Sequence, residues 1–296
     1  MAKLGEVCIQ ITDGSHNPPS GVEQSEYLML SSKNIDDDFI TLDSPRFLSH
    51  SDYIAENKRT TVSEGDLLMT IVGTIGRVAI VPAGLNGICL QRSVAVIKPN
   101  KEIINNRYLM YQLQNMRSFL EKEARGVAQK GIYLKQVSQL DIKLPELEQQ
   151  KQIVKVLDKV TELISLRKQQ LTKLDELVKA RFVEMFGDPI GNTKNLPVTK
   201  FVDVVKMQRG FDLPVQERKS DGMIPIYGSN GVLGYHDISK VKGGGVITGR
   251  SGTIGKVFYE KGEFWPLNTT LFSLNSHGND VVYLKYLLEL FDLSRF

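Results

Sequence analysis

Residues 144–186, LPELEQQKQIVKVLDKVTELISLRKQQLTKLDELVKARFVEMF, contain a long periodic pattern. Alternate steps of three and four residues from Gln150 to Met185 reach eleven positions, of which eight are apolar. A period of 3.5 residues is typical of the apolar seam of a coiled coil. The predicted partner seam consists of Ile153, Leu157, Val160, Ile164, Leu171, Leu174, Val178 and Met185.

The ends of this pattern also predict one continuous helix. Pro145 suits the first helical turn, where its missing N–H would have no partner anyway, and Gly187 with Pro189 forms a stop signal. The helix would be roughly 60 Å long at about 1.5 Å per residue. Because a lone apolar stripe is not stable in water, the helix needs a partner from this chain or another. The alternative is a helix packed across a globular core, but its length and clean stop favour a spacer or assembly helix.

Composition indicates a globular protein. The chain has 296 residues, enough for two ordinary domains, and its formal net charge is only +3. Any nucleic-acid surface must therefore come from the arrangement of charge. The sequence has no apolar run of about 18 residues and no signal peptide, and Cys8 and Cys89 are far apart. We therefore expect a cytoplasmic protein without a membrane span, a disulfide framework or a structural zinc site.

The segments on either side of the predicted helix resemble each other. Residues 73–78, GTIGRV, recur as GTIGKV at 252–257, an offset of 179. Residues 90–93, LQRS, resemble LNTT at 267–270. Further matches join 3–7 to 200–204 and 107–111 to 282–286. Several matches in the same order indicate a duplicated domain.

Short β-rich runs separated by Gly and Pro turns precede a helical patch in each copy. The predicted fold class is α/β (α+β), with two related mixed α/β domains joined by a long coiled-coil helix. The predicted boundaries are 1–144 for the first domain, 145–187 for the helix and 188–296 for the second domain. Because the second copy stops at Phe296, we expect it to be incomplete, without a second long helix.

Two motifs that suggest enzyme chemistry fail its requirements. HNPPS at 16–20 has Ser20 where the motif of amino-methyltransferases has an aromatic ring. GTIGK at 252–256 lacks the first glycine of a phosphate loop and the Ser or Thr after its lysine. The four histidines have no metal-ligand spacing. We therefore expect a non-catalytic chain with no metal and no cofactor of its own.

Polar residues in the loops of both copies suit DNA recognition. Arg, Asn and Gln pair with guanine or adenine edges, whereas Lys, Ser and Thr suit phosphates. The predicted DNA-binding residues are Ser15, His16, Asn17, Arg77, Gln91, Arg92, Gln129, Lys130, Arg209, Arg250, Lys256, Asn268 and Thr269. Each of them taken alone could also be an ordinary solvated loop residue.

The order of globule, long helix and related globule resembles the specificity (S) subunit of type I restriction-modification systems. At the helix ends the resemblance is carried by LPELEQQKQI (144–153) and FGDPIGN (186–192). In the first copy it is carried by DGSH (13–16) and QKGI (129–132). In the second copy it is carried by RGFDLP (209–214), IPIYGSNG (224–231) and GRSGTIG (249–255).

The resemblance implies two target recognition domains, each binding one half of a bipartite double-stranded DNA site, and paired helices that set the spacing. It also implies that methyltransferase (M) subunits dock on this framework and that the restriction (R) subunit joins through them. AdoMet, ATP and Mg²⁺ would bind only to those partners, and the S subunit itself would be non-catalytic.

The family pattern has a second long helix, which this chain lacks, so we expect a C-terminally truncated S subunit that pairs through its seam with another chain. Self-association is one form of that pairing. Two alternatives remain open. One is a coiled-coil scaffold or inactive fragment that binds protein partners without sequence-specific DNA recognition, and the other is a methyltransferase or nuclease in its own right.

Overall fold

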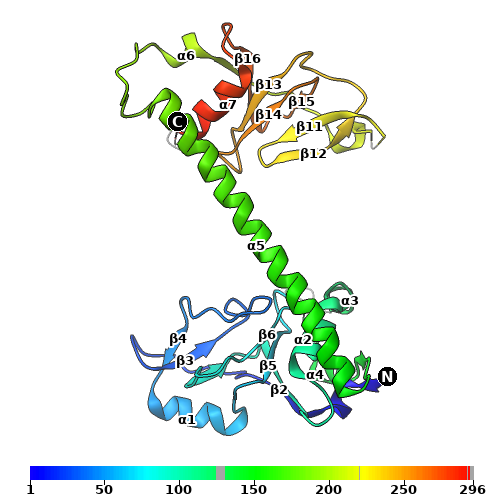
Figure 1. The fold of residues 1–296 in the computed structure, drawn as a ribbon. Helices are drawn as coiled ribbons and strands as arrows, with labels where there is room; N and C mark the ends of the chain where they lie inside the picture. The colour runs from blue at the N-terminus through cyan, green and yellow to red at the C-terminus, as the bar shows by residue number, and fades with distance from the viewer. Residues whose placement is uncertain (125–130, 220, 292, 294–296) are drawn as a thin grey trace. The chain divides into compact units, whose positions relative to one another are not determined.

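The computed structural model describes residues 1–124, 131–219, 221–291 and 293 (Figure 1). The chain divides into two compact units, unit 1 (Met1–Ser165) and unit 2 (Leu166–Phe296). One helix, α5 (Leu147–Phe186), begins in unit 1 and ends in unit 2. Among the described residues, none of the helices has both the length and the apolar character needed to cross a membrane.

Unit 1 contains strands of two sheets and a separate strand pair. The strands are β1 (Ala2–Lys3), β2 (Cys8–Asp13), β3 (Tyr27–Leu30), β4 (Arg46–Leu48), β5 (Leu67–Thr70), β6 (Val78–Ile80), β7 (Ile88–Leu90), β8 (Val94–Pro99) and β9 (Asp141–Ile142). The helices are η1 (Leu4–Glu6), α1 (His50–Arg59), α2 (Asn106–Asn115), α3 (Arg117–Glu123) and α4 (Leu134–Ser138). An antiparallel four-stranded sheet has the order β2-β8-β5-β6, and a three-stranded sheet has the order β4-β3-β7.

The two central strands of the four-stranded sheet of unit 1, β8 and β5, are buried on both faces. Leu67 and Met69 of β5 pack in one cluster with Leu109 of α2. Leu68, which lies between them, packs in another cluster with Leu30 of the three-stranded sheet. Successive side chains of a strand point to opposite faces, so this continuous apolar run serves two cores. The layers of unit 1 therefore follow in the order α2, four-stranded sheet and three-stranded sheet, and Tyr53 of α1 packs with Met29 on the outer face of the three-stranded sheet.

Unit 2 repeats this design. Its strands are β10 (Lys206–Arg209), β11 (Ile224–Gly228), β12 (Gly231–His236), β13 (Gly245–Gly249), β14 (Val257–Glu260), β15 (Trp265–Pro266) and β16 (Thr270–Asn275). Its further helices are α6 (Phe201–Val204), η2 (Val215–Glu217) and α7 (Val281–Glu289). The sheets, β10-β16-β13-β14 and β12-β11-β15, match those of unit 1 strand for strand. The prediction of two related mixed α/β domains joined by a long helix is confirmed.

The two units differ from the predicted repeat in one detail. Isolated parallel bridges join Ser15 to Gln91 in unit 1 and Phe211 to Leu267 in unit 2. Because these bridges occupy the same place in the two units, Gln91 corresponds to Leu267 and not to Asn268. The sequence match aligned two leucines, and it is therefore wrong by one residue at this loop.

The start of α5 is attached to unit 1 by polar contacts. Gln150 is fully buried, its side-chain oxygen accepts from the Asn105 N–H at 2.8 Å, and its amide donates to the carbonyl of Ile103 at 3.1 Å. Further along the helix, the Asp158 carboxylate accepts from Arg107 and from the Tyr111 hydroxyl. These contacts fix the first turns of the helix against α2 and the loop before it.

The end of α5 is attached to unit 2 by aromatic contacts. The buried Phe182 ring lies 5.3 Å from that of Tyr283 and 6.1 Å from that of Tyr286, both on α7. Gly187 then takes a φ of 84° in the left-handed region, where glycine carries no Cβ penalty. The helix therefore ends at Phe186, next to the stop signal identified in the sequence.

Candidate nucleic-acid interface

The predicted residues of unit 1 lie in loops at one end of the four-stranded sheet. The register pairs Asp13 with Ala95 and Thr70 with Val94. Strands β2 and β5 therefore end where β8 begins, because each of them is an antiparallel neighbour of β8. The loops at this sheet end carry Ser15, His16, Asn17, Arg77, Gln91 and Arg92.

Unit 2 brings its predicted residues to the equivalent sheet end. Arg209 pairs with Leu271 and Gly249 pairs with Thr270, so β10 and β13 end where β16 begins. The residues at this end are Arg209, Arg250, Lys256, Asn268 and Thr269. Gln129 and Lys130, which were also predicted to contact DNA, lie outside the described residues.

The loop after β2 is tightly held. Gly14 allows its close approach to β7, because a Cβ there would lie 2.1 Å from the carbonyl oxygen of Leu90. Ser15 is buried, and its hydroxyl donates to Glu56 of α1 at 3.0 Å. The backbone N–H of Arg92 donates to the carbonyl of Ser15 at 2.9 Å, which joins this loop to the one before β8. Ser15 therefore holds the loop, whereas the next two residues are exposed.

The sequence prediction missed Arg59, the last residue of α1. Its Nη2 donates to Oδ1 of Asp13 at 2.8 Å, and Nε2 of His16 lies 2.8 Å from Oδ2 of the same carboxylate. A basic residue at the end of a helix is an ordinary sequence feature. Nothing in the sequence indicates that Arg59 contacts a strand end 46 positions earlier.

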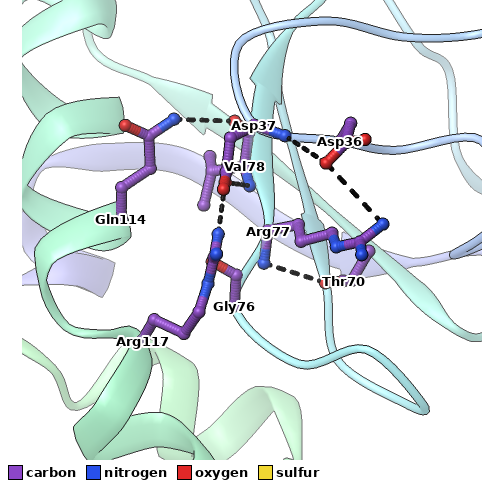
Figure 2. A network of polar contacts seen from close by, with 8 residues as sticks. All are labelled: Asp36, Asp37, Thr70, Gly76, Arg77, Val78, Gln114 and Arg117. Carbon is purple, nitrogen blue, oxygen red and sulfur yellow. Dashed lines mark hydrogen bonds and ion pairs between the residues drawn. The ribbon is translucent and has the colours of Figure 1, made fainter. Parts of the chain in front are cut away.

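The turn between β5 and β6 of unit 1 is braced from several sides (Figure 2). The Arg77 N–H donates to Oγ1 of Thr70 at 3.0 Å, and the Arg77 guanidinium lies 3.7 Å from Asp36. Arg117 donates to the carbonyl of Gly76 at 3.2 Å and pairs with Asp37. Figure 2 also shows Gln114 donating to the carbonyl of Val78, at 3.1 Å. Acidic residues thus partner both arginines near this turn.

The matching turn of unit 2 is more open. Ile254 is 43% exposed, whereas its counterpart Ile75 is 6% exposed. Lys256 donates to the amide oxygen of Asn230 at 2.6 Å, and its partner is therefore neutral. The Arg250 N–H donates to the carbonyl of Thr269 at 2.8 Å, and the Arg250 side chain is exposed. This turn therefore presents positive charge that a neutral amide does not cancel.

Two other predicted residues of unit 2 differ in their surroundings. The amide of Asn268 donates to the carboxylate of Asp212 in the loop after β10, so its orientation is set by a side chain. Arg209, at the end of β10, is exposed. A guanidinium is a group that suits either a base edge or a phosphate.

The thiols do not provide nucleophiles at neutral pH. Burial raises the pKa of Cys8 and of Cys89 to about 12, so both stay protonated. Within the described ranges, no group of three or more His, Cys, Asp and Glu side chains is arranged to hold a metal ion.

The predicted seam of α5 is largely exposed. Ile153 packs against the core of unit 1. The other seven seam residues range from 36% exposed at Leu157 to 54% at Leu174. Val156, Leu163 and Leu177 are also exposed and follow at intervals of seven or fourteen residues, so they widen this apolar face.

Comparison with known proteins gives the family. The model of the type I restriction modification DNA specificity domain matches residues 27–176, which are 150 of the 296 residues. A putative type I restriction enzyme MjaX specificity subunit of Methanocaldococcus jannaschii is 31% identical over 118 residues, 40% of this chain and 27% of its own length. The type I restriction enzyme EcoBI specificity subunit of Escherichia coli is 37% identical over 100 residues, 33% of this chain and 21% of its own length. The chain thus covers about a quarter of the length of these two curated relatives.

Solved structures share the fold. The S subunit of a type I restriction-modification system from M. genitalium superposes with a TM-score of 0.54 at 14% identity, covering 99% of this chain and 78% of that one. A chain from a structure of complex assembly and conformational transition in the type I R-M system gives a TM-score of 0.50 at 17% identity, covering 98% and 78%. Together with the family model, which matches half of the sequence, the two sheet-and-helix units and their long helix show that this chain belongs to the type I restriction-modification DNA specificity family.

Proposed function

We propose that this chain recognises a bipartite double-stranded DNA sequence, with unit 1 and unit 2 each binding one half. The observation that carries this proposal is the matched sheet end, to which both units bring exposed basic and amide side chains. His16, Asn17 and Arg92 of unit 1 suit base edges, whereas Arg250 and Lys256 of unit 2 suit phosphates as well. A net charge of only +3 is compatible with this function, because a nucleic-acid surface depends on how the charge is arranged and not on its total.

In this proposal the exposed face of α5 packs against a second long helix. Methyltransferase subunits dock on this helical framework, and the restriction subunit joins through them. AdoMet, ATP and Mg²⁺ belong to those partners, and this chain contributes no catalytic group. The names of the curated relatives, which describe specificity subunits, support this division of roles.

The direct test is selection of random duplex DNA by the chain purified with its methyltransferase subunits. We expect enrichment of two short conserved blocks separated by a fixed number of unconserved base pairs. The affinity should fall with salt by about 0.9 in log K per log unit for each phosphate contact.

Two results would contradict the proposal. A complex that forms but enriches no sequence would support the scaffold alternative. AdoMet binding or DNA cleavage by the isolated chain would support an enzyme.

A further inference from the structure

We propose that Asp13 positions Arg59 so that its guanidinium recognises a guanine in the half-site bound by unit 1. This inference rests on the proposed function, because it concerns the same sheet end. Arg59 is outside the set of DNA-binding residues predicted from the sequence.

The Asp13 carboxylate is buried, and its two partners are not. The Asp13 side chain is 11% exposed, whereas those of Arg59 and His16 are 51% and 52% exposed. A carboxylate removed from water needs charged or hydrogen-bonded partners. Asp13 therefore fixes one end of each partner side chain, while about half of each partner remains open to solvent.

The backbone around Arg59 is held as well. The hydroxyl of Thr60 donates to the backbone carbonyl of Asp13 at 3.0 Å. Glu56, three residues before Arg59 on α1, accepts from Ser15 at 3.0 Å. Residues three apart share one helix face, so the end of α1 is fastened to the loop at two points. Binding then requires little further ordering of the Arg59 side chain.

The chemistry favours guanine. A guanidinium has five N–H donors in a planar fork, and the contact with Asp13 uses Nη2. Arginine bidentate to O6 and N7 of guanine is the commonest specific contact in the major groove. Asp13 holds the Arg59 guanidinium through one nitrogen and leaves the other edge of the guanidinium free to contact guanine. Arg92, in the adjacent loop, can contact a phosphate or a second base.

This arrangement is specific to unit 1. Asp13 pairs with Ala95, the second residue of β8, and Arg209 pairs with Leu271, the second residue of β16. Arg209 therefore occupies the place of Asp13 in unit 2. Any loss of recognition caused by changing Asp13 or Arg59 should be confined to one half of the target.

The test uses the full chain with its methyltransferase subunits and the DNA target obtained by selection. Each guanine is replaced in turn by 7-deazaguanine, which lacks N7, or by inosine, which keeps N7 and O6. In the wild type, 7-deazaguanine at one position should lower the affinity for DNA by about fivefold or more, which is within the range for a base contact. Inosine at the same position should leave the affinity unchanged.

The variant Arg59→Lys keeps a positive charge beside Asp13 but has no planar fork. It should bind unmodified DNA about 5–150-fold more weakly and lose the 7-deazaguanine penalty, with an unchanged unfolding temperature. Asp13→Asn should reduce the same penalty. The matched control Lys58→Ala, changed one residue away on the same helix, should keep it in full.

Two outcomes overturn this inference and leave the proposed function standing. In one, the wild type selects a bipartite target but no guanine shows an N7 penalty. In the other, Arg59→Lys keeps the full penalty. If the wild type selects no sequence at all, the proposed function itself fails.

Discussion

The exposed seam of α5 yields a quantitative prediction about assembly. Leu171 and Leu174 are 53% and 54% exposed. Fully burying a leucine side chain is worth roughly 1.5–3 kcal/mol, so covering the exposed half of each should stabilise assembly by about 0.8–1.5 kcal/mol. The two leucines together contribute about 1.6–3 kcal/mol per helix, which corresponds to roughly 15–150-fold in affinity.

Changing both leucines to aspartate should exceed this loss. It removes the apolar contribution and also leaves two carboxylates inside an apolar interface, at a cost of several kcal/mol unless partners are found. We therefore expect association to fall by more than about 100-fold. The isolated chain should keep its helical circular dichroism and its unfolding temperature, because both side chains are exposed in the chain alone.

Light scattering after size exclusion, over a range of concentrations, measures this assembly with and without the methyltransferase subunits. The matched control changes Gln169 and Thr172 to aspartate, which places two carboxylates on the opposite side of the same helical turns. The control should assemble like the wild type. Equal assembly of the seam variant, or equal loss in the control, would refute the assignment of the seam.

Three further predictions follow from local contacts. Burial raises the pKa of Cys8 and Cys89 to about 12, so Ellman's reagent at pH 8 should react slowly with both thiols until the protein unfolds, and rapid labelling would contradict this. Gln150→Leu removes the side-chain partner of the Asn105 N–H and of the Ile103 carbonyl, which are only partly buried. The free energy of unfolding of unit 1 in urea should therefore fall by about 0.5–1.5 kcal/mol for each lost hydrogen bond, and an unchanged midpoint would refute the anchoring role. Lys256→Ala should reduce the salt slope of DNA binding by about 1, whereas Arg77→Ala should reduce it less, because the Arg77 guanidinium already lies beside the Asp36 carboxylate. Identical slopes for these two variants would contradict the contrast between the turns.

The sequence predicted correctly the elements that are determined by residues close together in the chain. The seam extends over α5 with no Gly or Pro, so its period identifies one long helix. The GTIG turns were visible because their glycines take positive φ, 79° at Gly76 and 92° at Gly255, where other residues are strained. This turn occurs once on each side of the long helix, together with other matched segments in the same order, and the repeat therefore indicated a duplicated domain.

The details that the sequence did not show depend on tertiary register. Ser15 was selected as a DNA contact for its hydroxyl, but its burial and its bond to Glu56 depend on where α1 lies. Arg59 was missed because its partner, Asp13, is 46 residues away. The sequence match aligned Gln91 with Asn268, whereas the backbone pairing aligns it with Leu267. The two differ by one residue because side-chain similarity does not determine which backbone groups pair.

The measurement that tests the account most directly is adenine-methylation mapping on plasmid DNA in cells that express the chain with its methyltransferase subunits. It should be made for the wild type and for the variant Arg250→Ala/Lys256→Ala. We expect a recurrent bipartite motif for the wild type, with the variant relaxing or losing one half and preserving the other. A single contiguous motif, or equal loss in both halves for the variant, would contradict the claim that each unit recognises its own half of the target.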